Sequence, residues 1–216
     1  DESVWFRRKG ELVAALIKDD GTPVSSTQCT IGSVAFNALI SFCAAELAEF
    51  TSDDHLAALA TELSESLTAQ WSSELRTWVD EGATTNGSRA TRTLEGLLPL
   101  LVERRAQVIA DAVSELVSEA SFCGPFGLRQ VHPSEPTYDP DAYWRGPSWP
   151  QLNYLFQLAL RRHGLVDASE NLWTASARGA LQSEFSEYWS AEDGGGGGAR
   201  PQSWSGLILL KHHEIH

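Results

Sequence analysis

Apolar residues recur at helical spacing along almost the whole chain after Ser33, and this periodicity limits the folds open to it. The clearest stretch, residues 56–71, places leucines, an alanine and a tryptophan three and four positions apart on one helix face. No stretch after Ser33 alternates polar and apolar residues as a half-buried strand does. We therefore expect an all-α fold of consecutive helix hairpins, with long loops gathered at one end.

Caps and breakers place further helices. The same spacing recurs in residues 33–50, 94–101, 106–120, 168–181 and 204–210, and Pro99 bends or ends the second of these. Another helix follows Ser148, a candidate N-cap, with Pro150 in its first turn and Gly164 as its stop. Before Ser33 the signal is mixed, and residues 12–21 fit either a short hairpin or a helix end followed by a loop.

Two long loops interrupt the helices. Residues 122–147 are rich in glycine and proline, yet five aromatic side chains interleave with them, which argues against disorder. We expect this segment to be an ordered loop that lines a site. The run Gly194–Gly198 predicts a flexible loop instead.

The charge balance excludes several classes of function. The chain of 216 residues has 16 basic and 29 acidic side chains, a net charge of −13, which matches neither a nucleic-acid backbone nor an anionic membrane. No run of about 18 apolar residues and no signal-peptide pattern is visible, so we expect a cytoplasmic protein. Cys29, Cys43 and Cys123 form no CxxC pair and should be buried thiols. The lack of methionine and the abrupt start at Asp1 suggest a piece of a longer protein or an omitted modified residue.

The densest chemical cluster is Tyr-Trp-Arg-Gly-Pro-Ser-Trp at residues 143–149. Its Arg145 lies just before a predicted helix, where a guanidinium can hold a carboxylate or ring hydroxyls. A structural aromatic corner with an ion pair explains the string equally well.

A second cluster surrounds Glu187, which lies between Phe185 and Tyr188-Trp189. Desolvation between aromatic rings would raise the pKa of this carboxyl towards the range of a general base. A solvated acid at a helix end is the commoner arrangement for a glutamate. Further along, Gln202 is suited to hydrogen-bond a polyol, and Trp204 to serve as a sugar platform or as core.

Taken in order, these strings resemble the C-terminal half of the (α/α)6 toroid glycoside hydrolases of the family 63 type, over residues 33–210. The strings at residues 143–149 and 187–189 are the most specific part of the resemblance. This group includes α-glucosidases and hydrolases of glucosylglycerate and mannosylglycerate. The placing of Gln202 two residues before Trp204 is most similar to the glucosylglycerate branch.

The resemblance implies an inverting α-glycosidase that hydrolyses a small glucoside such as glucosylglycerate to glucose and glycerate, without a cofactor. Glu187 matches the general base of the group. The substrate-binding positions are Tyr143, Trp144, Arg145, Gly146, Trp149, Gln202 and Trp204. The general acid of the group is an upstream aspartate that residues 1–5 do not match. This chain would then hold half of a catalytic pair and be inactive alone.

Other functions stay open at this point. They are hydrolysis of trehalose or an oligosaccharide on the same toroid, a non-catalytic carbohydrate-binding domain, and a helical-repeat interaction protein. We expect one domain over residues 1–216, an incomplete portion of the toroid, with a small sugar as its partner and with homo-oligomers allowed. The terminal residues 212–216 match no zinc spacing, and the glycine run lacks the Lys-Ser/Thr of a phosphate loop, so neither a metal nor a nucleotide is expected.

Overall fold

The computed structural model describes residues 2–18, 20–22, 32–81 and 90–210. It divides into two units, Asp1–Gly32 and Ser33–His216, and each is described by itself. The single domain expected over residues 1–216 therefore stays a prediction. Cys29 and the terminal histidines lie outside the described residues.

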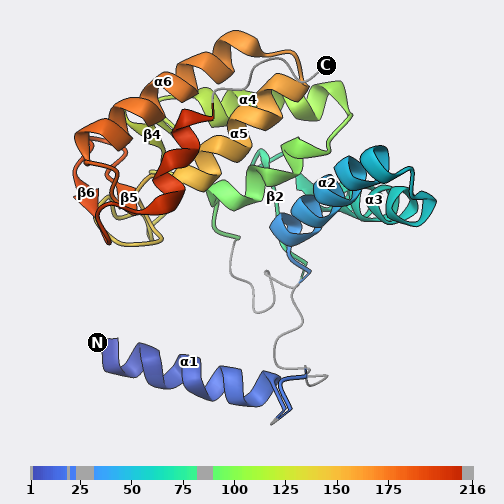
Figure 1. The fold of residues 1–216 in the computed structure, drawn as a ribbon, viewed down its shortest axis with the longest axis horizontal. Coiled ribbons are helices and arrows are strands. Elements are labelled where there is room, and N and C mark those ends of the chain that lie inside the picture. The colour runs from blue at the N-terminus through green and yellow to red at the C-terminus, as the bar shows by residue number, and fades with distance from the viewer. Residues whose placement is uncertain (1, 19, 23–31, 82–89, 211–216) are drawn as a thin grey trace. The chain divides into compact units, whose positions relative to one another are not determined.

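The smaller unit is built on helix α1 (Glu2–Leu16), drawn in blue in Figure 1. Beyond it the chain turns, with the amide of Gly21 donating to the carbonyl of Lys18 at 2.8 Å and the Asp20 carboxylate accepting from the amide of Thr22 at 2.9 Å. Of the two interpretations of residues 12–21, the helix end followed by a loop is confirmed.

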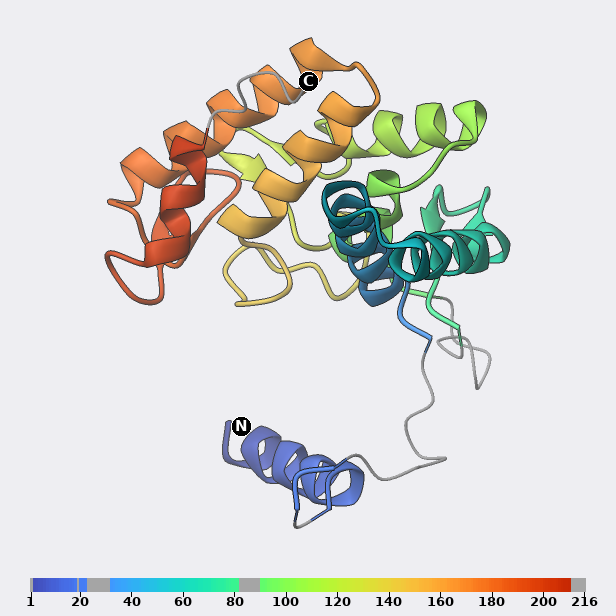
Figure 2. The same cartoon turned by 45° about the vertical axis from the view of Figure 1, so that its right-hand side comes forward.

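The larger unit consists of paired helices. Helices α2 (Val34–Thr51), η2 (Leu94–Leu101), α5 (Pro150–Arg162) and η3 (Ser203–Leu209) contact one another in that order. Helices α3 (Asp54–Ser66), α4 (Ala106–Val117) and α6 (Val166–Gln182) pack against α2, η2 and α5 respectively. Figure 1 shows α2 beside α3 and α5 beside α6, and Figure 2 shows the same pairs from a second side.

The core follows η2, which is a 3-10 helix containing Pro99. Its leucines are buried on all sides because η2 lies between α2 and α5, so a segment that is apolar all round is stable there. The fully buried side chains of Phe122, Leu128 and Phe156 continue this core towards α5.

Several helix ends differ from the prediction because tertiary partners decide them. Helix α3 stops at Ser66, and after η1 (Leu67–Gln70) the chain forms β1 (Trp71–Ser72), which pairs with β2 (Thr77–Trp78). Trp71 therefore packs edge-on against the Trp78 ring, with 4.6 Å between centroids, instead of ending a helix. Helix α4 likewise ends at Val117, three residues early.

The N-cap expected at Ser148 is also wrong. Trp149 holds the N-cap position of α5, without a side-chain cap. The Ser148 hydroxyl instead accepts a hydrogen bond of 2.8 Å from the side-chain amide nitrogen of Asn153. The stop at Gly164 is confirmed, since φ is +72° there.

The long loops meet at the end of the unit where α5 and η3 begin. They form two further hairpins of two-residue strands, β3 (Cys123–Gly124) with β4 (Gly127–Leu128) and β5 (Tyr188–Trp189) with β6 (Gly196–Gly197). The Phe126 amide donates to the Ala191 carbonyl at 3.1 Å, and the Ser148 amide donates to the Trp189 carbonyl at 2.7 Å. The prediction that the loops gather at one end is confirmed.

Two properties of helix α2 qualify the composition argument. Cys43 is exposed on it and Cys123 is half-buried, so the expectation of three buried thiols is wrong for Cys43. Length and composition alone would also let Val34–Thr51 cross a membrane, although core helices of water-soluble folds meet the same criterion. In this structure α2 packs against α3 and η2, and the Ser41 hydroxyl donates to the Ala60 carbonyl at 2.7 Å.

Candidate active site

Glu187 follows an abrupt turn at the end of α6. Glu184 and Phe185 both have left-handed backbones, with φ of 55° and 58°, which L-residues adopt rarely. Two residues after Glu187, Trp189 is fully buried, and its indole N–H donates to the Phe126 carbonyl at 2.6 Å. The turn and this buried anchor fix the short segment that carries Glu187.

Two donors hold the Glu187 carboxylate, one on each oxygen. The Tyr143 hydroxyl donates to Oε1 at 2.7 Å, and the backbone amide of Ala199 donates to Oε2 at 3.1 Å. These two hydrogen bonds, that of Tyr143 first, lower the pKa of Glu187 below its usual value. The expected rise in this pKa is therefore wrong, because hydrogen bonding outweighs desolvation at this half-exposed position.

The same contact raises the pKa of Tyr143 to about 12, chiefly through the hydrogen bond to Glu187. Tyr143 thus stays a neutral donor while Glu187 stays ionised across the neutral range. A fixed, ionised carboxylate is the state that a general base needs.

Aromatic rings surround this carboxylate. Trp144 stacks on Trp149 with 3.9 Å between ring centroids and 8° between planes, and Tyr143 meets Trp149 edge-on at 5.0 Å. The indole N–H of Trp204 donates to the Glu187 carbonyl at 2.9 Å. The structure thus brings together four of the predicted aromatic residues around Glu187.

These aromatic residues differ in exposure. Trp144 is 49% exposed and Tyr143 and Trp204 are also open to solvent, whereas Trp149 is only 1% exposed. Trp149 lies beneath Trp144 and beside Tyr188, at 5.0 Å. It therefore supports the exposed rings and offers no free face to a sugar, contrary to the expectation that it binds one directly.

Arg145 and Gly146 belong to the turn beneath these rings. The Arg145 guanidinium lies 3.5 Å from the Asp139 carboxylate, and both side chains are exposed. A Cβ atom at Gly146 would lie 2.4 Å from the Cα of Pro140, so this position admits only glycine. Gly146 shapes the loop. The Arg145 guanidinium, expected to hold a carboxylate or ring hydroxyls of a ligand, lies beside the Asp139 carboxylate of the chain itself.

Gln202 lies at the N-terminus of η3. Its side-chain oxygen accepts from the backbone amide of Ser203 at 2.8 Å, which caps this helix. Its backbone amide donates to the Phe185 carbonyl at 2.8 Å. Gln202 thus lies on the same side of the unit as Glu187, with its carbonyl oxygen engaged by the cap.

The sequence interpretation missed an ion pair that ties the site loops together. Buried Arg129 pairs with Glu192, and Tyr138 donates to the same carboxylate at 2.9 Å. Arg129 also donates to three backbone carbonyls, those of Glu119, Ser121 and Cys123. No local motif signals this pair, because its members are 63 positions apart in the sequence.

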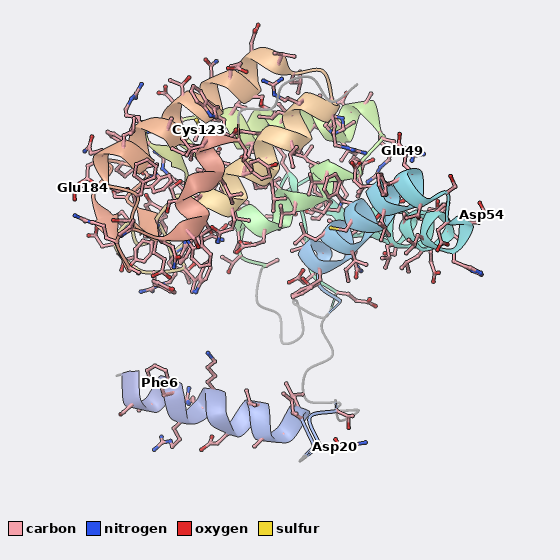
Figure 3. The ribbon with its side chains drawn as sticks, in the orientation of Figure 1. Phe6, Asp20, Glu49, Asp54, Cys123 and Glu184 are labelled. Carbon is pink, nitrogen blue, oxygen red and sulfur yellow. The ribbon has the colours of Figure 1, made fainter. Side chains whose placement is uncertain are left out.

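A cleft of about 720 Å³ in this unit lies elsewhere. Its lining includes Asp54, Glu103 and Arg162, at the opposite end of α5 from Trp149, and no phenylalanine, tyrosine or tryptophan. Figure 3 labels Asp54 far from Glu184, which lies close to Glu187 in the chain. Sugar sites use aromatic faces, so the geometry around Glu187 is the better candidate. Within the described residues, no group of three or more His, Cys, Asp or Glu side chains could hold a metal ion.

Comparison with known proteins places this arrangement in a family. The profile of the mannosylglycerate hydrolase MGH1-like glycoside hydrolase domain matches residues 24–205. Mannosylglycerate hydrolase of Thermus thermophilus is 30% identical over 126 residues, which are 56% of this chain and 29% of the relative. Glucosylglycerate hydrolase of Mycolicibacterium hassiacum is also 30% identical, over 125 residues, 56% of this chain and 28% of the relative. The chain thus spans under a third of the length of these relatives.

Solved structures show the same fold. A crystal structure of the GH63 mannosylglycerate hydrolase of Thermus thermophilus in complex with glucose matches 83% of this chain and 47% of its own, with a TM-score of 0.74 and 22% identity. Neutral trehalase of Saccharomyces cerevisiae matches 83% of this chain and 37% of its own, with a TM-score of 0.65 and 14% identity. The expected all-α portion of a toroid is confirmed, and the chain belongs to the family of MGH1-like glycoside hydrolase domains.

Proposed function

We propose that the whole protein is an inverting glycoside hydrolase in which Glu187 acts as the general base. The observation that carries this proposal is the ionised Glu187 carboxylate, held by Tyr143 and Ala199 beside the exposed ring of Trp144. In an inverting reaction such a base activates a water molecule on one face of the sugar. A carboxylic acid roughly 6.5–9.5 Å away protonates the leaving oxygen, and we assign it to a part of the whole protein outside this chain.

The proposed substrate is a small glycoside of glycerate, glucosylglycerate in particular. The two relatives described above are named as hydrolases of mannosylglycerate and glucosylglycerate, and one solved structure is a complex with Tris and D-glycerate. Tyr143, Trp144, Trp204 and Gln202 are the side chains we assign to the sugar. Arg145 remains the proposed partner of the glycerate carboxylate and would have to exchange its contact with Asp139.

Trehalose is the second candidate substrate, because the fold is shared with a neutral trehalase. Hydrolysis of a panel of glucosylglycerate, mannosylglycerate, trehalose and isomaltose by the whole protein separates these cases. NMR of the first product gives its anomer, and inversion of configuration is expected. Retention of configuration would contradict the assigned mechanism.

We also propose a cytoplasmic location.

The role of Glu187 is tested by Glu187→Gln, which keeps the shape of the side chain but removes the base. We expect kcat to fall by about 10²–10⁴-fold with KM nearly unchanged, because the base acts on water and not on the sugar. Glu184→Gln is the matched control, since this exposed acid lies three residues earlier and pairs with Arg200 at 3.6 Å. Near-normal turnover in Glu187→Gln would overturn the proposal.

A further inference from the structure

Two residues of the glycine run, which was expected to be a flexible loop, form strand β6 along the segment that carries Glu187. Strand β6 pairs with β5 in the register Gly197 to Tyr188 and Gly196 to Trp189. The pairing continues beyond the strand, where the Glu187 amide donates to the Ala199 carbonyl at 2.8 Å. The Ala199 amide, in turn, reaches the Glu187 carboxylate. The backbone of residues 196–199 therefore lies directly against the proposed base.

The glycines permit a close approach that no other residue allows. A Cβ atom at Gly197 would lie 2.5 Å from Cζ of the Tyr188 ring. At Gly198 a Cβ atom would lie 2.7 Å from the Glu187 Cβ and closer still to its Oε2. Gly198 also has φ of +73°, a conformation that L-residues rarely adopt. Close packing and backbone conformation, not flexibility, explain why these positions are glycine.

From this packing we infer that residues 196–199 are a positioning element for the Glu187 carboxylate, with Gly198 as its decisive residue. The inference rests on the proposed function of Glu187. Tyr143 alone would fix Oε1 and leave the carboxyl group free to turn about that contact. The Ala199 amide fixes Oε2, and only a glycine at 198 lets the backbone come close enough to donate. A methyl group at 198 would push the carboxylate away from this donor.

The test is Gly198→Ala in the whole protein. We expect kcat to fall by about 10–10²-fold with KM little changed, because a misplaced base is costly even when the sugar still binds. The acid limb of the kcat–pH profile should move to higher pH. The limb moves in this direction because the Ala199 amide lowers the pKa of Glu187, and the variant loses that donor.

Two glycine variants separate positioning from strain. Gly164 has φ of +72°, and a Cβ atom there meets nothing within 4 Å, so Gly164→Ala carries the same backbone strain without the contact. Gly195→Ala lies in the same run, where the nearest atom is Oδ1 of Asp193 at 3.2 Å. Both should lower the melting temperature at most and leave the pH profile in place.

An ester bond in place of the 198–199 amide covers the case in which Gly198→Ala fails to fold. It removes the Ala199 donor without adding an atom, and it should move the acid limb in the same direction. An unchanged pH profile in the ester protein, or a Gly198→Ala enzyme that behaves like Gly164→Ala, would overturn the positioning role alone if Glu187→Gln still shows its expected loss of kcat. Near-normal turnover in Glu187→Gln would overturn the proposed function itself, and the positioning role with it.

Discussion

At the scale of single residues, the hydrogen bond between Tyr143 and Glu187 makes a prediction about pH. Tyr143→Phe removes the donor and keeps the ring in contact with Trp144 and Trp149. Glu187 must be ionised to act, and this donor is the largest cause of its lowered pKa. Losing it raises that pKa, so activity should now disappear at a higher pH on acidification.

At the pH optimum we expect Tyr143→Phe to cost about tenfold in kcat, the order of one hydrogen bond to a charged group. Initial rates across the pH range measure both effects. Tyr154→Phe is the control, because Tyr154 lies on α5 and packs against the hydrophobic core. An acid limb that stays in place in Tyr143→Phe would show that the phenol does not hold the base.

The two stacked tryptophans should fail in different ways. Trp144→Ala removes an exposed ring, so sugar affinity should fall by on the order of 1–3 kcal/mol with little change in melting temperature. Trp149→Ala opens a cavity under the stack, and we expect a loss of about 3–5 kcal/mol in unfolding free energy. Calorimetric titration with sugar and denaturant unfolding measure the two effects. Full stability with lost affinity in Trp149→Ala would return this residue to the binding surface.

The residue scale also shows what sequence reasoning can reach. It identified Glu187 and its aromatic surroundings, because both lie in short strings. It gave the wrong direction for the pKa, because the two donors come from Tyr143, 44 positions earlier, and from a backbone amide. It could not tell that Trp149 is buried while Trp144 is exposed, since burial of a tryptophan depends on what stacks over it.

At the scale of elements, the Arg129–Glu192 pair joins the β5–β6 loop to the β3–β4 hairpin. We expect Glu192→Gln to cost about 1 kcal/mol in unfolding free energy, a low figure because the Glu192 carboxylate is partly exposed. The pKa of Glu192 is lowered, first by Arg129. Its contribution is therefore present above the unfolded pKa and lost as pH falls through the folded one.

Urea unfolding of wild type and Glu192→Gln at neutral and at acidic pH tests this linkage. The difference in unfolding free energy should shrink on acidification, and Glu184→Gln should show almost no difference at either pH. A difference that does not depend on pH would mean that the charge of Glu192 contributes nothing.

Elements were predicted where periodicity is long and missed where it is short. Helices α3 and α4 follow from apolar spacing, because many side chains on one face report the same period, whereas α5 follows from its early proline and its glycine stop. The hairpins have two residues per strand, too few for an alternation to be visible. The glycine run was misread for a related reason, since the need for close packing comes from Tyr188 and Glu187, which the run itself does not reveal.

At the scale of the whole molecule, this chain matches 47% of the chain of a solved relative that has the same fold. A proposed base without its acid cannot complete an inverting hydrolysis. We expect the 216-residue chain alone to show no hydrolysis of glucosylglycerate, and the whole protein to show it. Measurable turnover by the chain alone would mean that another carboxyl group of this chain serves as the acid.

The open side of helix α2 leads to a prediction about association. Five apolar or weakly polar side chains lie on it at intervals of four and three residues, namely Phe36, Ile40, Cys43, Leu47 and Phe50. This spacing places them on one helix face. All five side chains are exposed, and the exposed fraction is 69% for Phe36 and 88% for Phe50. An apolar stripe of this length is unusual on the surface of a soluble monomer.

We therefore expect the chain to self-associate in a concentration-dependent way in sedimentation equilibrium and to bind an apolar dye. Leu47→Glu places a charge in the middle of the stripe and should reduce both, because burying an unpaired carboxylate is costly. Leu181→Glu is the matched control, since this leucine is exposed on α6, away from the stripe. Equal association in the two variants would show that another surface holds the copies together. A chain that stays monomeric and binds no dye would show that the stripe is covered in solution.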